Sequence, residues 1–580
     1  MRKARSATSK GFSVVEVLLA ASIFSLLVTA LVGAFLYGQE SSALAGARAR
    51  AGQLADEGLE ASRSIRDGAF TNLTDGAHGL AVSGGVWTYS GTQDIAGQFT
   101  RAVTVSTVDA NTKTLTSTVS WQQNAQRTGT ASATTRLTNW SVAVAALFPD
   151  GLLVYGDGTT TPKYRTYATS TNTFGAQTGT LVATSGRTFT LRTSPTKTEA
   201  IAGYVTAAGV LNVLCFNGTT WTNDWSVTVG GTGTTRRFDI AYETASGDVM
   251  VLYSTNTATT NELAYRTKLG SAGCGAANWA AATNLNPVRT SGIVHWVKMA
   301  WDRRAGQNLI TAIWADASAD LSAMVWSGSA WGNEPTTAMS TTLEVVTAAQ
   351  DVEDFDVDYE SLSGDVMVVW SNAVVGNTVR YRACTGGTAT CTWSAITTPI
   401  FADDATNLDI SANPNTDQIV FASIGNLQSD LQLGYWSGTA WTIATNVDQT
   451  AATPLAGTKL VSTGWLINGA TTRSIVVYND SATTNIGYYA GNLGVFTVQA
   501  DFAPTPVFAN PQKYYQLEMN PLSKDQLMLS LSDNLNDSYS KRLLMTAVPA
   551  FTWTNADGGA LVTTLPQAIN SPFAFAYKRF

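Results

Sequence analysis

An apolar strand followed by a polar loop recurs along most of this 580-residue chain, at intervals of 46 to 60 residues. The clearest copies are GDVMVLYST from position 247, GDVMVVWSN from 364 and DQLMLSLSD from 525. A repeat of this length constrains the fold strongly, because each unit must bury its apolar face against the next one. Further copies begin at 151, 307, 417 and 473, and a weaker one, IAGYVTAAGV, begins at 201.

Each unit divides naturally into four strands. It opens with a short strand such as FDIAY (238–242) or FDVDY (355–359), turns into the apolar strand, and ends in a hairpin such as WSGSAW (326–331). Parallel β-helices and leucine-rich repeats use much shorter units, whereas a four-stranded propeller blade needs ~40 to 50 residues. The repeat therefore predicts an all-β propeller of eight four-stranded blades, with seven as the alternative because the unit near 201 is degenerate.

The last residues, FAFAYKRF, resemble the opening strands of the repeats. Phe573–Tyr577 has the same pattern as 238–242 and 355–359. A C-terminal strand of this kind would supply the opening strand of the first blade. Such closure of the ring removes the exposed sheet edges of an open array.

The N-terminal forty residues have a different pattern. Basic residues among the first ten precede an apolar run in which Glu16 is the only charge. Its uncharged part, Val17–Leu36, would span a ~30 Å hydrocarbon core as a helix that rises ~1.5 Å per residue. The basic flank predicts a single-pass segment with its N-terminus in the cytoplasm. A signal peptide would have a shorter apolar run, and a plain signal anchor leaves the carboxylate of Glu16 unexplained.

The sequence KGFSVVEVLL around Glu16 resembles the processing site of type IV prepilins and of type II secretion pseudopilins. In that family a basic leader ends in Gly, followed by Phe and, at the fifth mature position, Glu; here these are Gly11, Phe12 and Glu16. The resemblance implies cleavage between Gly11 and Phe12 by a prepilin peptidase, N-methylation of Phe12, and filament assembly with other pilin subunits by the inner-membrane assembly machinery. It also implies that Glu16 pairs with the N-terminal amine of a neighbouring subunit.

Helical periodicity continues to about Arg66, and strand-like alternation begins at 86. Together with the resemblance, this organisation predicts a minor-pilin head between the helix and the repeats. We expect a leader at 1–11, a pilin helix at 12–66 with a transmembrane segment at about 14–37, a small antiparallel β head at 67–140, and the propeller at 141–580.

Four cysteines do not form a disulfide scaffold in a chain of this length. Cys384 and Cys391 flank TGGTAT. A Gly-Gly turn there would bring two strand ends together, so we predict a local disulfide in an oxidising compartment. Cys215 is interpreted as a small buried apolar residue and Cys274 as a loop thiol.

The composition disfavours several functional classes. The formal net charge is −7 and only 13% of residues are charged, without a basic stripe beyond the first ten residues, which argues against nucleic-acid binding. The two histidines, His78 and His295, provide little material for a catalytic triad or a histidine metal site. We expect no resident cofactor. Acidic stretches lack EF-hand spacing, and Asp316 and Asp320 are the first residues to consider if calcium binds.

The aromatic hairpins allow a carbohydrate-binding interpretation, but most tryptophans recur at equivalent positions and are expected in the core. Trp225 and Trp279 lie in predicted loops and are candidates for facing a ligand. The hairpins weakly resemble sialidase-type repeats, yet WSGSAW and WSGTAW lack the Asp-box aspartate. No pattern brings arginines such as Arg236, Arg303 and Arg380 together, so we predict no catalysis.

The sequence predicts a minor, tip-type type IV pilin that displays a propeller for adhesion or recognition of a surface, glycan or protein. The protein would lie in the cytoplasmic membrane before assembly and on a pilus at the cell surface afterwards. One alternative is a pseudopilus initiator of a type II-like secretion system that contacts cargo. Another is a filament-tethered, sialidase-like glycoside hydrolase. The sequence leaves the ligand and the choice between pilus, secretion and DNA uptake open.

Overall fold

The chain forms two compact units, residues 1–145 and residues 146–580. The predicted boundary at 140–141 falls among residues outside the described part of the chain. The computed structural model describes residues 13–580 except 110, 125, 140–147, 160, 180–183, 233, 344–352, 373–377, 402–404, 426–429, 449–450, 452–457, 481–485, 503–511, 548–549, 558–559 and 566–570.

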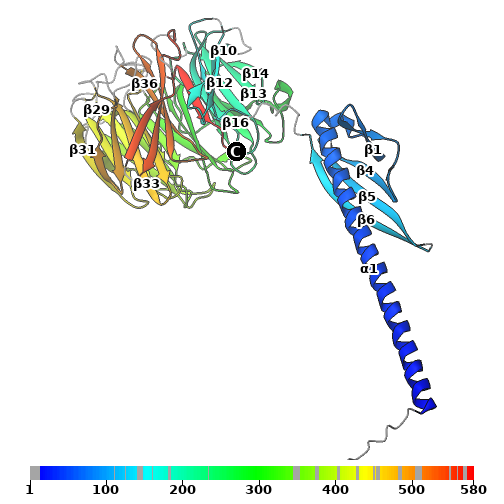
Figure 1. Ribbon diagram of the computed structural model, residues 1–580. Helices are drawn as coiled ribbons and strands as arrows, with labels where there is room; N and C mark the ends of the chain where they lie inside the picture. Colours follow the sequence, from blue (N-terminus) through cyan, green and yellow to red (C-terminus); the bar gives the residue numbers. More distant parts are fainter. Residues whose placement is uncertain are drawn as a thin grey trace, which may run out of the picture. The chain divides into compact units, whose positions relative to one another are not determined.

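One long helix, α1 (Val14–Gly68), dominates the first unit (Figure 1). Its apolar first half is exposed, and its second half packs on a small sheet through Ala51, Leu54, Leu59 and Ile65. By length and composition α1 is apolar enough to cross a membrane, and a signal sequence would meet the same test. The predicted single-pass segment is therefore supported by the length and composition of α1 alone.

The sheet of the first unit is antiparallel, in the order β2-β1-β4-β5-β6, with β3 paired to β4. Arg101 on β4 is buried where this sheet meets the helix. Its guanidinium donates to the carbonyl oxygen of Leu54 (3.1 Å) and pairs with Asp94 (2.8 Å) and Glu57 (3.3 Å). The elements are η1 (Phe70–Asn72), β1 (Gly76–Ser83), β2 (Val86–Ser90), β3 (Asp94–Ala96), β4 (Phe99–Asp109), β5 (Thr112–Asn124) and β6 (Arg127–Thr138).

The second unit consists of four- and five-stranded antiparallel sheets, eight of them within the described residues, and it has a propeller-like all-β fold (Figure 1). The first four sheets contain β7 (Gly151–Tyr155), β8 (Lys163–Ala168), β9 (Thr173–Phe174), β10 (Thr178–Gly179) and β40 (Phe573–Tyr577); β11 (Gly186–Thr193), β12 (Ala200–Thr206), β13 (Val210–Phe216) and β14 (Trp221–Thr228); β15 (Phe238–Tyr242), β16 (Val249–Ser254), β17 (Leu263–Lys268) and β18 (Thr283–Leu285), with η2 (Ala276–Asn278); and β19 (Val294–Trp301), β20 (Ile310–Asp316), β21 (Leu321–Trp326) and β22 (Trp331–Gly332).

The other four sheets follow the same up-and-down order. They contain β23 (Phe355–Tyr359), β24 (Val366–Asn372), β25 (Thr378–Thr385), β26 (Thr392–Trp393) and β27 (Thr397–Phe401); β28 (Ala405–Ala412), β29 (Ile419–Gly425), β30 (Leu431–Trp436) and β31 (Trp441–Asp448); β32 (Val461–Asn468), β33 (Thr471–Asn479), β34 (Ile486–Asn492) and β35 (Val495–Val498); and β36 (Gln512–Met519), β37 (Gln526–Asp533), β38 (Ser538–Ala547) and β39 (Ala550–Asn555).

One edge strand of each sheet contacts the corresponding strand of the next sheet, in the closed order β40-β11-β15-β19-β23-β28-β32-β36-β40. We call these the inner strands. The ring closes because the C-terminal strand β40 pairs antiparallel with β7, Phe573 lying opposite Tyr155. The expected pairing of the C-terminal strand with the first sheet is therefore present in the structure.

The core lies between neighbouring sheets, where large aromatic residues such as Trp296, Trp314 and Trp370 are fully buried. The turns ETASGD and ESLSGD contribute acceptors to this packing. Glu243 accepts a hydrogen bond from the Trp326 indole of the next sheet (2.6 Å), and Glu360 accepts one from Trp436 (2.5 Å). The recurring Trp and Glu positions therefore connect neighbouring sheets.

Candidate ligand-binding cavity

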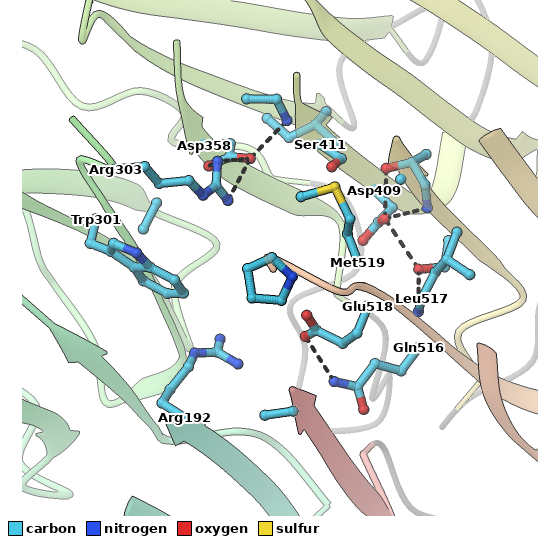
Figure 2. A pocket seen from close by; sticks show the side chains of 18 of the residues that line it. Arg192, Trp301, Arg303, Asp358, Asp409, Ser411, Gln516, Leu517, Glu518 and Met519 are labelled. Atoms are coloured by element: carbon cyan, nitrogen blue, oxygen red, sulfur yellow. Dashed lines mark hydrogen bonds and ion pairs between the residues drawn. The ribbon is translucent and has the colours of Figure 1, made fainter. Parts of the chain in front are cut away.

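The inner strands surround a cavity of about 500 Å³ on the axis of the second unit (Figure 2). Its walls come from seven of the eight inner strands together with residues that flank them. Polar and charged side chains reach the cavity from these strands because alternate residues of a strand point to opposite faces. They form two groups, which differ in how completely their charges are paired.

The first group is a network of ion pairs. Lys298 pairs with Asp356 (2.6 Å) and Glu353 (3.3 Å), and Glu353 also pairs with Arg236 (2.7 Å). Burial opposes ionisation of Glu353, but these two cations prevail and lower its pKa to about 2. Each charge of this group has a partner of opposite sign, as buried ions require.

The inner-strand aspartates also accept hydrogen bonds from the backbone of the next inner strand. Asp239 accepts from the Met299 N–H (2.9 Å) and Asp356 from the Ile410 N–H (3.0 Å). In the same way, Asp358 accepts from Ala412 (2.8 Å) and Asp409 from Thr463 (2.7 Å). These carboxylates join neighbouring sheets, so they act first as structural groups.

The second group lies around the indole of Trp301, at the end of β19. The guanidinium carbons of Arg579, Arg192 and Arg303 lie 4.3, 5.4 and 5.8 Å from the centre of this ring. Figure 2 shows Arg192 and Arg303 near this indole, on the same side of the cavity. We call these three arginines the arginine cluster. Cations over an aromatic face are attracted by the ring but repel one another.

Counter-charge is distributed unevenly over the arginine cluster. Arg303 pairs with Asp358 at 3.0 Å, and Arg192 lies 3.8 Å from Asp239. Within the described part of the chain, Arg579 forms neither an ion pair nor a hydrogen bond through its guanidinium. Burial and the two neighbouring guanidiniums lower the pKa of Arg579 to about 9, which leaves it charged at neutral pH.

Glu518 on β36 faces the same end of the cavity. Among the described residues, its carboxylate accepts one side-chain hydrogen bond, from Gln516 (3.2 Å). Burial raises the pKa of Glu518, and Arg192, Arg579 and Arg303 act in the opposite direction. The cavity therefore combines guanidinium donors with one carboxylate acceptor that has unused bonding capacity.

The predicted processing site cannot be located, because Gly11 and Phe12 lie outside the described residues. Glu16 is described, and it caps its own helix. Its carboxylate accepts a hydrogen bond from the Ser13 N–H (3.0 Å), while the Ser13 hydroxyl accepts one from Val15 (3.3 Å). This is a capping box, which stabilises a helix N-terminus.

The calcium candidates have other partners. Asp316 is fully buried, and its carboxylate accepts from the backbone N–H groups of Ser291 (2.8 Å), Gly292 (2.9 Å) and Ser318 (2.8 Å). Asp320 accepts from the Ser291 hydroxyl (2.5 Å). N–H donors therefore already use the Asp316 carboxylate within the fold, and calcium binding by this pair stays a prediction.

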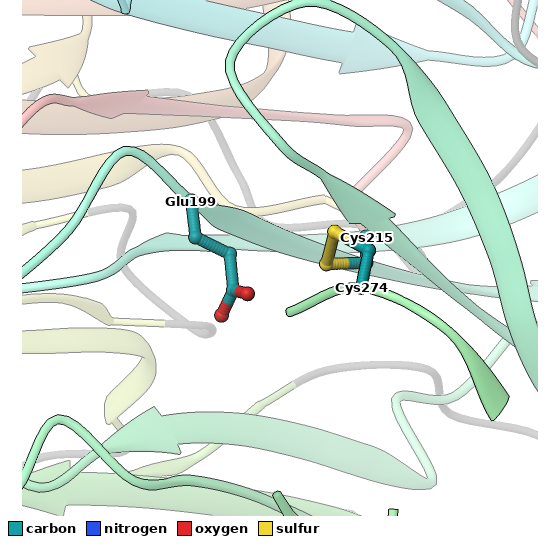
Figure 3. A group of neighbouring side chains, drawn as sticks. All are labelled: Glu199, Cys215 and Cys274. Carbon is teal, nitrogen blue, oxygen red and sulfur yellow. A yellow bond between two sulfur atoms is a disulfide. The ribbon is translucent and has the colours of Figure 1, made fainter. Parts of the chain in front are cut away.

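All four cysteines form disulfides, which corrects part of the sequence analysis. The predicted bridge between Cys384 and Cys391 is present. Cys215 and Cys274 also form a disulfide, so they are neither a free apolar residue nor a free thiol (Figure 3). Glu199 lies beside this bridge, but bonded sulfurs offer no thiolate to a metal, and the Glu199 carboxylate already pairs with Lys268 (2.6 Å).

The interpretation of Trp225 and Trp279 as ligand-facing residues was wrong. Each is only 7% exposed, and their rings pack against one another at 5.6 Å. The Trp279 indole donates to Asp224 (2.7 Å). Trp225 lies on the strand β14 and Trp279 directly follows η2, and both rings belong to the core.

Sequence reasoning noted Arg303 but missed Arg192, Arg579 and Trp301. A signal was available in the repeats. Arg303 follows VKMAW by two residues, and Arg579 follows FAFAY by two residues, so both occupy the same position after an inner strand. A residue-by-residue alignment of the repeats would have placed them together at one end of the ring.

Comparisons with known proteins give likenesses to solved structures alone. No family model matches the chain, and no curated protein matches it. The BP39L lectin from Burkholderia pseudomallei has 11% identity and a TM-score of 0.41, covering 64% of this chain and 98% of that chain. The six-bladed lectin of Aleuria aurantia has 12% identity and a TM-score of 0.32, covering 57% and 97%. An ulvan lyase, described as a polysaccharide lyase, has 11% identity and a TM-score of 0.35, covering 60% and 89%. These likenesses concern the propeller-like fold.

Proposed function

We propose that this chain is a minor, tip-type type IV pilin that displays an eight-bladed β-propeller for adhesion or recognition at the cell surface. The main support for the proposal is the difference in exposure between the two halves of α1. Its large apolar side chains from Val14 to Tyr37 are exposed, and its second half is buried against the small sheet. An apolar surface of this size needs lipid or protein partners.

The motif around Glu16 indicates which partners would cover this apolar surface. Its likeness to the prepilin processing site supports lipid before cleavage and the helices of other pilin subunits afterwards. A second unit of more than 400 residues would crowd a filament shaft, so a tip or rare position is the simplest arrangement. The disulfides agree with a location outside the cytoplasm.

Most carboxylates of the cavity are committed to structural contacts, which favours recognition over a hydrolase that uses two free carboxyl groups. Most glycoside hydrolases need such a pair, although sialidases use a tyrosine nucleophile in place of one of them. Asp356, Asp358 and Asp409 are each held by a cation and by a backbone N–H of the next strand. Such groups suit a rigid binding site.

Blocking the processing site tests the pilin assignment. A bulky substitution, Gly11→Leu, is expected to leave a longer precursor in the membrane, seen by immunoblot and by the intact mass of the purified chain. Gly33→Ala is the matched control, because no atom lies within 4 Å of a Cβ placed there. Normal processing of the Gly11 variant would contradict the assignment.

Removing residues 141–580 separates adhesion from pseudopilus initiation. If filaments still assemble but cells lose attachment, the displayed unit serves recognition. If assembly itself fails, the initiator alternative is favoured. Electron microscopy of sheared filaments and a cell-attachment assay provide the two measurements.

A further inference from the structure

The arginine cluster is only partly paired at close range. Arg303 pairs with Asp358 at 3.0 Å and Arg192 lies 3.8 Å from Asp239, whereas Arg579 shares Trp301 with both and forms no ion pair among the residues described. Glu518 acts electrostatically on all three arginines but forms no ion pair with any of them in the described part of the chain. Like charges gathered in a buried cavity are unfavourable unless a counter-ion joins them, and incompletely paired charges in a concave site are typical of binding sites.

The geometry of the cluster suits a planar or tetrahedral anion. A guanidinium presents paired N–H donors that match a carboxylate or sulfate. The three guanidiniums lie within 6 Å of one ring centre, so an anion beside Trp301 would interact with more than one of them. They already lie against the indole, which leaves less of that ring for a neutral ligand to stack on.

Glu518 indicates that the ligand also carries hydroxyl donors. A second anionic group would be repelled by this carboxylate, whereas a hydroxyl could donate to it. Gln516 lies beside Glu518 and also faces the cavity. Sugars with an acidic substituent combine an anion and hydroxyl donors within a few ångströms, and a volume of about 500 Å³ is in the range of small-ligand sites.

We propose that the arginine cluster and Glu518 bind the acidic sugar residue of a glycan, the arginines holding its carboxylate or sulfate and Glu518 a hydroxyl. This inference deepens the proposed recognition function and names its ligand class. It concerns the second unit only, so it can fail while the pilin assignment stands. Conversely, a chain that is never processed would still bind the sugar.

Calorimetric titration of the full chain in nonionic detergent tests the proposal with four small probes. Glucuronate and glucose 6-sulfate supply the two acidic groups on a sugar. Glucose supplies the hydroxyls without the charge, and glutamate supplies a carboxylate without the sugar. We expect at least one acidic sugar to bind in the millimolar range, and glucose and glutamate to bind about tenfold more weakly or not at all.

Arg579→Gln is the decisive variant. It removes an unpaired cation, so the fold should be kept or slightly stabilised while affinity for the acidic sugar falls by about tenfold or more. Arg187→Gln is the matched control: Arg187 lies on β11, as Arg192 does, but outside the cavity, and donates to the carbonyl oxygen of Thr232 (2.9 Å). Filament incorporation should be unchanged in both variants.

Each other outcome overturns part or all of the proposal. Equal binding of glucose would remove the electrostatic argument. Equal binding of glutamate would indicate an acidic peptide in place of a sugar. Absence of binding by both acidic sugars, or undiminished binding by Arg579→Gln, would show that the cluster is not the site.

Discussion

Charged residues on the inner strands fall into two kinds at the scale of single residues. Asp409 represents the first kind: it accepts from the Thr463 N–H and pairs with Lys459 (2.5 Å), so its charge is fully used in joining two sheets. Arg579, which follows the inner strand β40, represents the second, since it contacts the Trp301 ring but forms no ion pair among the described residues. A buried cation without an ion pair adds little to stability, so its presence favours a role in binding an anionic ligand.

Acidification is expected to destabilise the second unit through His295. Burial, assisted by the positive charge of Arg237, lowers the pKa of His295 from 6.5 to about 4. Folding therefore favours the neutral imidazole. Its contribution to the free energy of unfolding is fully present above pH 6.5, is lost as the pH falls through about 4, and amounts to about 3 kcal/mol. Thermal unfolding followed from neutral pH downwards measures it.

The variant His295→Gln provides the comparison. It has no group that titrates in this interval, so its unfolding temperature should fall less between pH 6.5 and 4 than that of the unmodified chain. Carboxylates such as Glu353 titrate in both proteins and cancel in the difference. Parallel curves for the two proteins would refute the assignment to His295.

At this scale the sequence predicts contacts between residues that are close in the chain and misses contacts between residues that are far apart in it. Cys384 and Cys391 are seven residues apart, and a local turn was enough to pair them. Cys215 on β13 and Cys274 in the loop after β17 of the next sheet are 59 residues apart, so only the packing of the sheets reveals their bridge. Arg192 and Arg579 meet for the same reason, because ring closure brings the last residues beside the second sheet.

At the scale of elements, the sequence pattern was sufficient to predict a helix or strand that has one apolar face or that consists of a continuous apolar run. The helix predicted at 12–66 is observed at Val14–Gly68, and the strands predicted at 238–242 and 355–359 are β15 and β23. Two-residue strands such as β9 and β26 have no pattern of their own. Their pairing is set by the neighbouring strand, so sequence periodicity could not find them.

Two glycines of α1 are expected to respond in opposite directions to alanine. A Cβ at Gly58 would approach the Ser117 Oγ to 2.3 Å and its Cβ to 3.1 Å, where the helix meets the sheet. Gly58→Ala should therefore destabilise the first unit by about 1–3 kcal/mol. At Gly52 no atom lies within 4 Å of the position that a methyl group would occupy, so Gly52→Ala should stabilise the unit by up to about 1 kcal/mol through helix propensity.

Hydrogen exchange of amides in the small sheet measures both effects on the first unit alone. Protection should fall in Gly58→Ala and be kept or rise in Gly52→Ala. A stabilised Gly58 variant would mean that Ser117 can move away, and that the close approach of helix and sheet is not needed.

At the scale of the whole molecule, the propeller-like fold could be predicted from the sequence. Each repeat has a recognisable local pattern, and the recurrence of that pattern along the chain indicates the architecture. The likeness of FAFAY to the other opening strands predicted the pairing of β40 with β7. Alignment of the repeats could have placed Arg303 and Arg579 at the same end of the ring, but the other contents of the cavity could not be predicted in this way. They depend on residues from seven inner strands that meet only after the ring has closed.

The role of Glu16 connects the first unit to the assembled filament, and two substitutions separate its two possible contributions. In the structure its carboxylate caps α1 by accepting from the Ser13 N–H. In a filament, as the prepilin resemblance implies, it would pair with the terminal amine of a neighbour. Glutamine can also serve at this position of a capping box but carries no charge, whereas alanine neither caps the helix nor carries a charge.

If the charge matters, Glu16→Gln and Glu16→Ala should both be processed, remain in the membrane and be lost from sheared filaments, as immunoblots of the two fractions would show. If Glu16→Gln enters filaments as the unmodified chain does, capping is the function of Glu16, and the register of the filament must be set by apolar contacts along α1.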